Sequence, residues 1–258
     1  MQPSHQGTTR FSNRVADYVR SRPRYPQGVL DILRSEAGLT TNMVVADIGS
    51  GTGFSSEPFL QNGNIVHGVE PNADMRSAAE TLLAKYPDFR SVNGTAEATT
   101  MPDRSIDLIV AGQAFHWFDQ VKTREEFCRI LREDGPVVLI WNTLQEDATP
   151  FMRAYMSLLH QFGTDFKVVV HTNVDRGQLQ AFYGGDFVKR MLPNEQRFDR
   201  EGLRSRLLSS SYTPPVGHPN HEPMLRELDR IFEQNQEGGE VRMEYATEVY
   251  VGRLQSIR

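Results

Sequence analysis

Short apolar runs and amphipathic segments alternate along residues 43–142. Runs of strand length occur at MVVADI, NIVHGVE, FRSVNG, SIDLIVAG and PVVLIWN. Helical periodicity marks EPFLQNG, NADMRSAAETLLAKY with Asn72 as its cap, and REEFCRILREDG, which ends at Gly135. The apolar runs are nearly continuous, as expected for strands covered on both faces. This alternation predicts a parallel sheet with helices on both sides.

The pattern changes on both sides of this region. Residues 27–38 have the periodicity of an amphipathic helix. After residue 142, the pattern predicts helices at FMRAYMSLLHQF, EGLRSRLLSSSY and MLRELDRIFEQN, a loop at TPPVGHPNHEP, and extended strands at FVKRMLPNEQRF and VRMEYATEVYVGRL. We therefore divide one predicted domain, 1–258, into an N-terminal segment (1–42), a core (43–148), a cap that shapes a substrate pocket (149–238) and a terminal strand (239–258).

Composition adds mainly exclusions. The 258 residues are 38% hydrophobic, which suffices for a buried core, and the net charge of −5 argues against nucleic acid as a partner. The start of the chain lacks a secretory signal and no apolar run reaches membrane-span length, so a cytoplasmic protein without membrane contact is expected. Cys128 is the single cysteine, and His218 and His221 lie in a proline-rich stretch without further ligands. No metal site is therefore expected.

Three glycines spaced two apart, Gly49, Gly51 and Gly53, directly follow the first predicted strand. Glycines in such a place indicate unusual backbone angles or the close approach of a ligand. A mononucleotide-binding loop requires a Gly-Lys pair, which this chain lacks. The dinucleotide fingerprint G-x-G-x-x-G requires a third glycine where Phe54 stands. The remaining pattern is D-I-G-S-G-T-G, which begins at Asp47.

This stretch resembles motif I of the class I S-adenosylmethionine-dependent methyltransferases. GVEPN, which places Glu70 after the second predicted strand, and MPDRSIDLIVAG follow in the order of that family, and AGQAFHWFD resembles its methyltransferase type 11 or trans-aconitate methyltransferase-like group. The resemblance covers residues 10–142 and extends weakly to the C terminus. It implies a Rossmann-like, doubly wound α/β sheet of seven strands, mostly parallel with the last strand antiparallel, and a helical cap from the C-terminal half.

The resemblance also implies a binding mode for S-adenosylmethionine, which would leave as S-adenosylhomocysteine. The glycine turn passes against the methionine part, Glu70 accepts hydrogen bonds from the ribose, and an N-terminal segment covers the cofactor. Thr95 stands where the family usually has an acid facing the adenine, so Thr95, the backbone of Ala96, or Glu97 takes that part. The implied cofactor residues are Tyr18, Arg22, Asp47, Gly49, Ser50, Gly51, Thr52, Gly53, Glu70, Pro71, Met75, Thr95, Ala96, Ala111 and Gln113.

Candidate substrate residues follow the fourth predicted strand, where the ligand-facing loops of open α/β sheets lie. His116 is either a general base or a residue that orders its loop, because histidine suits both roles at neutral pH. Trp117 and Arg24 are the predicted substrate-binding residues. Phe115, Trp117 and Phe118 either surround the sulfonium or fill the core.

These features together predict a methyltransferase acting on a small molecule by O-methylation. The alternatives are an NAD-dependent oxidoreductase and a non-catalytic protein that binds S-adenosylmethionine. A monomer or a homodimer is expected. The arginines that offer partners for a substrate carboxylate are Arg22, Arg24, Arg204 and Arg206.

Overall fold

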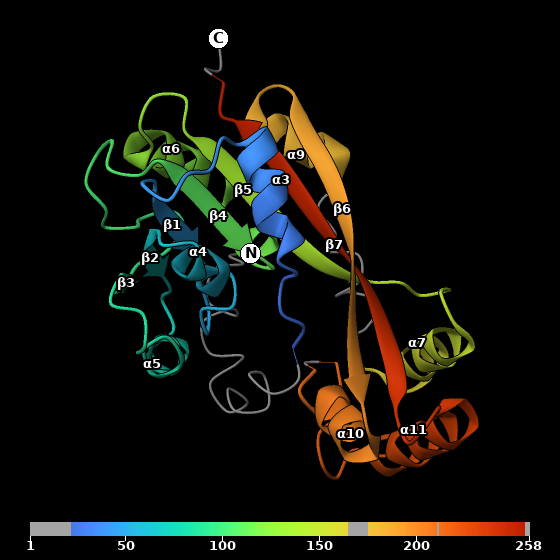
Figure 1. Ribbon diagram of the computed structural model, residues 1–258. Helices are drawn as coiled ribbons and strands as arrows, with labels where there is room; N and C mark the ends of the chain where they lie inside the picture. The colour runs from blue at the N-terminus through green and yellow to red at the C-terminus, as the bar shows by residue number, and fades with distance from the viewer. Residues whose placement is uncertain (1–21, 165–174, 211, 256–258) are drawn as a thin grey trace.

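The protein is built on one twisted, mostly parallel sheet (Figure 1). The computed structural model describes residues 22–164, 175–210 and 212–255. Within them the strands lie in the order β3-β2-β1-β4-β5-β7-β6, and β7 runs antiparallel to both of its neighbours. The predicted doubly wound, seven-stranded sheet is thereby confirmed. The strands are β1 (Val44–Ile48), β2 (Ile65–Val69), β3 (Phe89–Val92), β4 (Leu108–Gly112), β5 (Pro136–Leu144), β6 (Phe187–Phe198) and β7 (Val241–Arg253).

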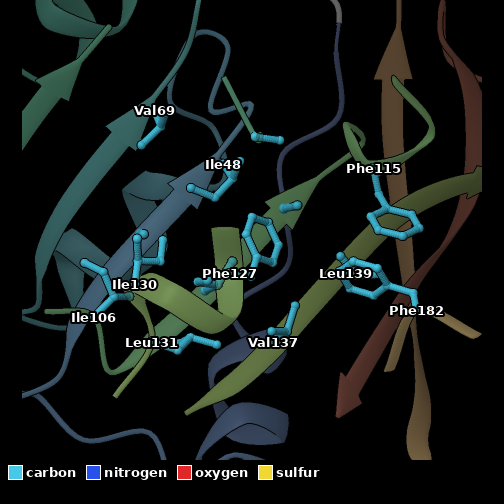
Figure 2. Packing of buried hydrophobic residues seen from close by; sticks show 14 of the residues in the cluster. Ile48, Val69, Ile106, Phe115, Phe127, Ile130, Leu131, Val137, Leu139 and Phe182 are labelled. Atoms are coloured by element: carbon cyan, nitrogen blue, oxygen red, sulfur yellow. The ribbon is translucent and has the colours of Figure 1, made fainter. Parts of the chain in front are cut away.

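Each face of the sheet is covered by its own apolar layer. Along β4, Leu108 and Val110 face one layer while Ile109 and Ala111 face the other, because successive side chains of a strand point to opposite sides. The first layer packs under α3 (Gly28–Glu36) and α4 (Ser56–Gln61). The second packs under α6 (Gln120–Ile130) and α9 (Arg176–Tyr183), as Figure 2 shows in part. The near-continuous apolar runs of the sequence follow from this two-sided burial.

A third apolar cluster forms the cap. It joins α7 (Pro150–Phe162), α10 (Arg200–Leu208) and α11 (His221–Asn235) to one end of the β6–β7 ribbon. β5 pairs with β7 only from Tyr245 onward, whereas β6 pairs from Val241, so the two-stranded ribbon extends past the rest of the sheet. The cap helices cover this extension, away from the body of the sheet (Figure 1).

The structure corrects three boundaries expected from the sequence. α6 ends at Ile130 rather than at Gly135, because the extended Leu131 forms a parallel bridge with Ile106. α11 begins at His221, inside the stretch expected to be a loop. The segment expected to form the cap also divides, because α9 packs on the main sheet while α7, α10 and α11 form the cap.

The predicted cap of α5 (Ala73–Leu82) is confirmed, since the Asn72 side chain accepts a hydrogen bond from the backbone N–H of Met75. In the described part of the chain, no helix is long and apolar enough to cross a membrane. Those residues also include no cluster of three or more potential metal-ligating side chains.

Candidate functional site

The glycine loop between β1 and α4 adopts a conformation that glycine favours. Gly49 has φ +68°, and a Cβ built there would lie 2.6 Å from the Cβ of Ala114, so both its angle and its packing require glycine. Gly51 has φ +54°, but a Cβ there would meet no atom within 4 Å. The backbone of Gly51 is therefore open on the side where another residue would carry its Cβ. Such a loop allows a ligand to contact the main chain directly.

The glycine loop opens onto a cavity of about 290 Å³. The walls come from the glycine loop, the ends of β4 and β5, residues 116–117 after β4, residues 22–25, and the cap. This is the edge of an open α/β sheet at which ligands bind, beyond the carboxyl ends of the strands. The cavity is lined by Arg22, Pro23, Tyr25, Gly49, Ser50, Gly51, Thr52, Phe54, Ser55, Gly112, Gln113, His116, Trp117, Trp141, Asn142, Thr143, Leu144, Glu146, Met156, Arg206, Tyr212 and Tyr245.

Glu70 joins the end of β2 to this loop. Its carboxylate accepts hydrogen bonds from the backbone N–H groups of Gly51 (3.0 Å) and Asn72 (2.9 Å). Burial raises the pKa of Glu70, while these two hydrogen bonds oppose the rise. The carboxylate therefore has donors on both sides, and a sugar with two adjacent hydroxyls suits the same acceptor. Pro71 follows it, and the Pro71 carbonyl accepts a hydrogen bond from Arg76.

Asp47 is completely buried at the end of β1, beneath the glycine loop. Its Oδ2 accepts hydrogen bonds from the hydroxyls of Ser55 (2.8 Å) and Ser56 (2.6 Å). Its Oδ1 has no partner among the described residues, and neither has Oγ1 of Thr52 in the loop. Burial raises the pKa of Asp47 to about 6, although the two serine hydrogen bonds act in the opposite direction. Two buried polar atoms at the loop thus lack a partner among the described residues, and of the two residues Thr52 lines the cavity.

The residues expected around the adenine lie beside β2 and β3. Met75 and Ala96 are buried, and Thr95 forms an isolated antiparallel bridge with Ala98. Glu97 accepts a hydrogen bond of 2.9 Å from the backbone N–H of Asp119. Glu97 thus holds the start of α6, and Thr95, the backbone of Ala96 and Glu97 stay as alternatives for the adenine contact.

The end of β4 contains Ala111, which is buried in the sheet, and leads to Gln113 in the left-handed backbone region with φ +55°. That conformation is uncommon for a residue other than glycine and costs backbone strain. It is held by hydrogen bonds from the Gln113 backbone N–H to the carbonyl of Ile140 (2.9 Å) and from its Nε2 to the carbonyl of Asn142 (3.0 Å). The strained residue faces the cavity.

The chain immediately before α3 crosses the cavity edge. The carbonyl of Arg24 accepts a hydrogen bond from Asn194 (2.8 Å), and that of Pro23 accepts one from Asn142 (3.4 Å). These bonds tie residues 23–24 to β5 and β6, and Arg22 lines the cavity beside them. Tyr18, also expected at the cofactor, lies outside the described residues.

A short 3₁₀ helix, η2 (Phe115–Trp117), places His116 and Trp117 at the cavity, with 4.8 Å between their ring centroids. Burial lowers the pKa of His116 to about 4, so its imidazole is neutral at neutral pH. Phe115 instead points into the core, where its ring lies 4.6 Å from that of Phe182 (Figure 2). Phe118 packs against the same core cluster. Two of the three aromatic residues of this segment therefore have a packing role.

The four arginines have different surroundings. Arg24 makes a salt bridge to Glu57 (2.5 Å) and stacks over Phe54 at 4.0 Å, and it is not among the residues described as lining the cavity. Arg204 on the cap forms a two-pronged pair with Asp229. Arg22 and Arg206 line the cavity. The geometry thus gives no support to substrate binding by Arg24.

Sequence reasoning missed several cavity residues. Asn142 ends the apolar run PVVLIWN, so its place at the carboxyl end of β5 was a usable signal. Tyr212, which follows α10, and Tyr245 on β7 both belong to the apolar cluster of the cap and line the cavity, and their sequence surroundings carry no comparable signal.

This strand order, with a glycine loop after β1 and an acid after β2, defines a Rossmann-like α/β protein, a class in which ligands bind at this edge of the sheet. A family model described as a methyltransferase domain matches residues 46–139. An uncharacterized methyltransferase-like protein of Schizosaccharomyces pombe is 27% identical over 225 residues, 86% of this chain and 85% of that protein. An uncharacterized methyltransferase of Mycobacterium tuberculosis is 35% identical over 136 residues, about half of each chain (53%).

Among solved structures, a putative type II methyltransferase from Anaeromyxobacter dehalogenans has a TM-score of 0.70 at 21% identity, covering 92% of this chain and 99% of that one. This likeness supports the fold. These matches identify a methyltransferase domain in residues 46–139, and together with the relatives they indicate that the chain is a methyltransferase of the S-adenosylmethionine-dependent kind. The family decides against the NAD-dependent alternative.

Proposed function

We propose that this methyltransferase methylates an oxygen atom of a small molecule that binds in the cavity. One observation carries the proposal: the glycine loop and the cap residues Met156, Arg206 and Tyr245 line the same cavity. A cavity bounded by a cap suits a small ligand better than the side chain of a large protein, because its walls enclose the ligand on several sides.

The residues present fit the cofactor. Gly49–Gly53 would lie against its methionine part, where Asp47 Oδ1 and Thr52 Oγ1 offer unpaired polar atoms. Glu70 would accept hydrogen bonds from the ribose with the acceptor capacity that its carboxylate keeps beyond the bonds from Gly51 and Asn72. Pro71, Met75, Thr95 and Ala96 would surround the adenine.

When bound, S-adenosylmethionine supplies a methyl group on a positively charged sulfur, which needs no further activation. The tasks left to the protein are alignment of the acceptor and exclusion of water. His116 lies at the cavity with a neutral imidazole, which has a free lone pair for the proton of a hydroxyl acceptor but, with a pKa of about 4, is a weaker base than an ordinary histidine. Trp117 offers an aromatic wall beside it, and Gln113 a polar one.

The experiment combines the protein with S-adenosylmethionine that carries a labelled methyl group and with a metabolite extract. The expected result is a small product that carries the label on oxygen. If the product is a methyl ester, alkaline hydrolysis releases the label as methanol; if it is a methyl ether, the label stays on the product. Label found only in protein, or in a product methylated on nitrogen, carbon or sulfur, contradicts the proposal. Calorimetry with S-adenosylhomocysteine separately checks that the cofactor binds.

A further inference from the structure

Arg206 is a buried charge on the cap side of the cavity. It lies on α10, is 2% exposed and contributes to the cavity lining. Its Nη1 donates to the hydroxyl of Ser210 (2.8 Å), and its Nε lies 3.5 Å from the hydroxyl of Tyr245. Both of these groups are neutral. A guanidinium remains charged at all ordinary pH values, so a full positive charge is buried here.

No carboxylate is paired with Arg206 in the described part of the chain. Glu146 is the acidic residue of the cavity lining, but its side chain is exposed. Burying an unpaired charge is costly, and proteins normally pair such a group or bind an anion to it. Arg206 therefore requires an explanation that the fold itself does not supply.

A second buried polar group neighbours Arg206, although it is not among the residues described as lining the cavity. Tyr155 on α7 is fully buried, and its hydroxyl has no hydrogen-bond partner among the described residues. Burial raises the pKa of Tyr155, and the positive charges of Arg206 and Arg22 oppose the rise, in keeping with a position near both arginines. A buried hydroxyl without a partner is also unfavourable. A ligand that accepts hydrogen bonds would satisfy the hydroxyl and the guanidinium together.

Arg204, two residues earlier on the same helix, shows the usual arrangement. Its Nε and Nη2 donate to the two oxygens of Asp229 at 3.1 and 2.9 Å, and the side chain is well exposed. One helix thus carries one arginine paired with a carboxylate from the protein, and one that is buried at the cavity without such a partner.

We propose that Arg206 and the hydroxyl of Tyr155 form an anion subsite that binds a carboxylate of the substrate, so that the methyl acceptor is a small organic acid. The proposal rests on the function proposed above. A carboxylate accepts two parallel hydrogen bonds from a guanidinium, and its single charge matches that of Arg206.

The first test measures binding rather than turnover. Thermal unfolding of the protein saturated with S-adenosylhomocysteine is followed with sodium acetate, succinate or citrate, and with acetamide, succinamide or sodium phosphate at matched ionic strength. At least one carboxylate should raise the melting temperature of the wild type and of Arg204→Met, and should have no such effect on Arg206→Met. Equal effects on all three proteins, or stabilisation by phosphate and by none of the carboxylates, would overturn the subsite.

Arg206→Met should itself unfold at the same or a higher temperature, because it removes a buried charge that has no partner. Should this variant fail to fold, Tyr155→Phe is the second test, since it removes a hydroxyl that the described fold does not use. It should keep its melting temperature and weaken the stabilising carboxylate several-fold. Unchanged carboxylate binding in Tyr155→Phe would remove that hydroxyl from the subsite.

The second test applies the labelled-methyl assay to a metabolite extract that has been fractionated by anion-exchange chromatography at neutral pH. The acceptor should be retained on the exchanger, and its half-saturating amount should rise about ten- to hundredfold in Arg206→Met but not in Arg204→Met. An acceptor in the unretained fraction would overturn the subsite while leaving the proposed methyl transfer intact. If no fraction is methylated although S-adenosylhomocysteine binds, the proposed function fails and the melting experiment alone decides on the subsite.

Discussion

The carboxylate of Glu70 accepts a hydrogen bond of 3.0 Å from the backbone N–H of Gly51, which connects the end of β2 to the middle of the glycine loop. Its other oxygen accepts a hydrogen bond from Asn72, the cap of α5. One side chain therefore holds two elements that would lie against the two ends of a nucleoside. Its loss would affect both the contacts to the ribose and the position of the loop.

We predict that Glu70→Ala weakens binding of S-adenosylmethionine by about 1.5–3 kcal/mol, the value of a hydrogen bond to a charged group. Calorimetry with S-adenosylmethionine and S-adenosylhomocysteine measures the change. Glu36→Ala is the control, because the Glu36 carboxylate pairs with Arg190 rather than with the glycine loop. Equal affinities of the wild type and Glu70→Ala would show that Glu70 serves the loop alone.

Asp47 should destabilise the folded protein at neutral pH. Its pKa is raised to about 6 by burial, so the folded state keeps a proton that the unfolded chain loses near pH 4. Stability from this group therefore decreases as pH rises from about 4 through 6, by about 2–3 kcal/mol in all. Asp47→Asn should thus gain melting temperature relative to the wild type as the pH increases from 5 to 8.

The same Asp47→Asn variant should bind S-adenosylmethionine more weakly, because an amide cannot match the negative charge beneath the loop. Differential scanning calorimetry across the pH range and binding calorimetry at pH 7.5 measure the two effects. A melting-temperature difference that stays constant between pH 5 and 8 would be inconsistent with a raised pKa.

Gly51 and Gly217 form a matched pair of glycines. Both have positive φ, +54° and +89°, and a Cβ at either position would meet nothing within 4 Å. An alanine at each should therefore cost a similar amount of stability, about 1–2 kcal/mol from the left-handed backbone. Only Gly51 lies at the cavity. Gly51→Ala should reduce affinity for S-adenosylhomocysteine at least tenfold, whereas Gly217→Ala should leave it unchanged. Equal affinities of the two variants would show that the glycine loop is not part of the cofactor site.

Much of the sheet could be predicted because each parallel strand carries its own signal. Two-sided burial makes the run around Leu108 apolar throughout. The helical connections between the parallel strands are short, so the apolar runs recur at regular intervals along the sequence. Gly49 and Gly51 were predictable for a related reason, since their backbone angles exclude most other residues. Such features depend on local geometry and therefore leave a trace in the local sequence.

The cap side of the site could not be predicted in the same way. Arg204 and Arg206 stand two positions apart on α10 and look alike in the sequence. Only the folded cap places one beside Asp229 and the other beside Tyr245. α9 was not predicted for a similar reason. It is a short helix whose buried residues, Leu179 and Phe182 among them, pack on a part of the sheet that is distant in the sequence. Long-range packing decided these cases.

His116 should act on turnover rather than on cofactor binding. Its neutral imidazole lies at the cavity, so His116→Gln should lower turnover of a hydroxyl acceptor about 10²–10⁴-fold, the usual contribution of a general base. Its affinity for S-adenosylhomocysteine should stay within a few-fold of the wild type. If cofactor binding collapses while turnover at saturating cofactor survives, His116 is a cofactor or structural residue.

The burial of His116 should also appear in the pH dependence of stability. Its pKa is about 4 in the folded protein and about 6.5 when unfolded, so the unfolded chain binds the extra proton between these values. Stability from this group is therefore complete above pH 6.5 and decreases as pH falls towards 4, by at most about 3 kcal/mol. This trend opposes that of Asp47, so the difference between wild type and His116→Gln is measured at each pH by denaturant titration. That difference should shift in favour of His116→Gln as the pH falls from 7 to 4.5, and a pH-independent difference would show that His116 titrates normally.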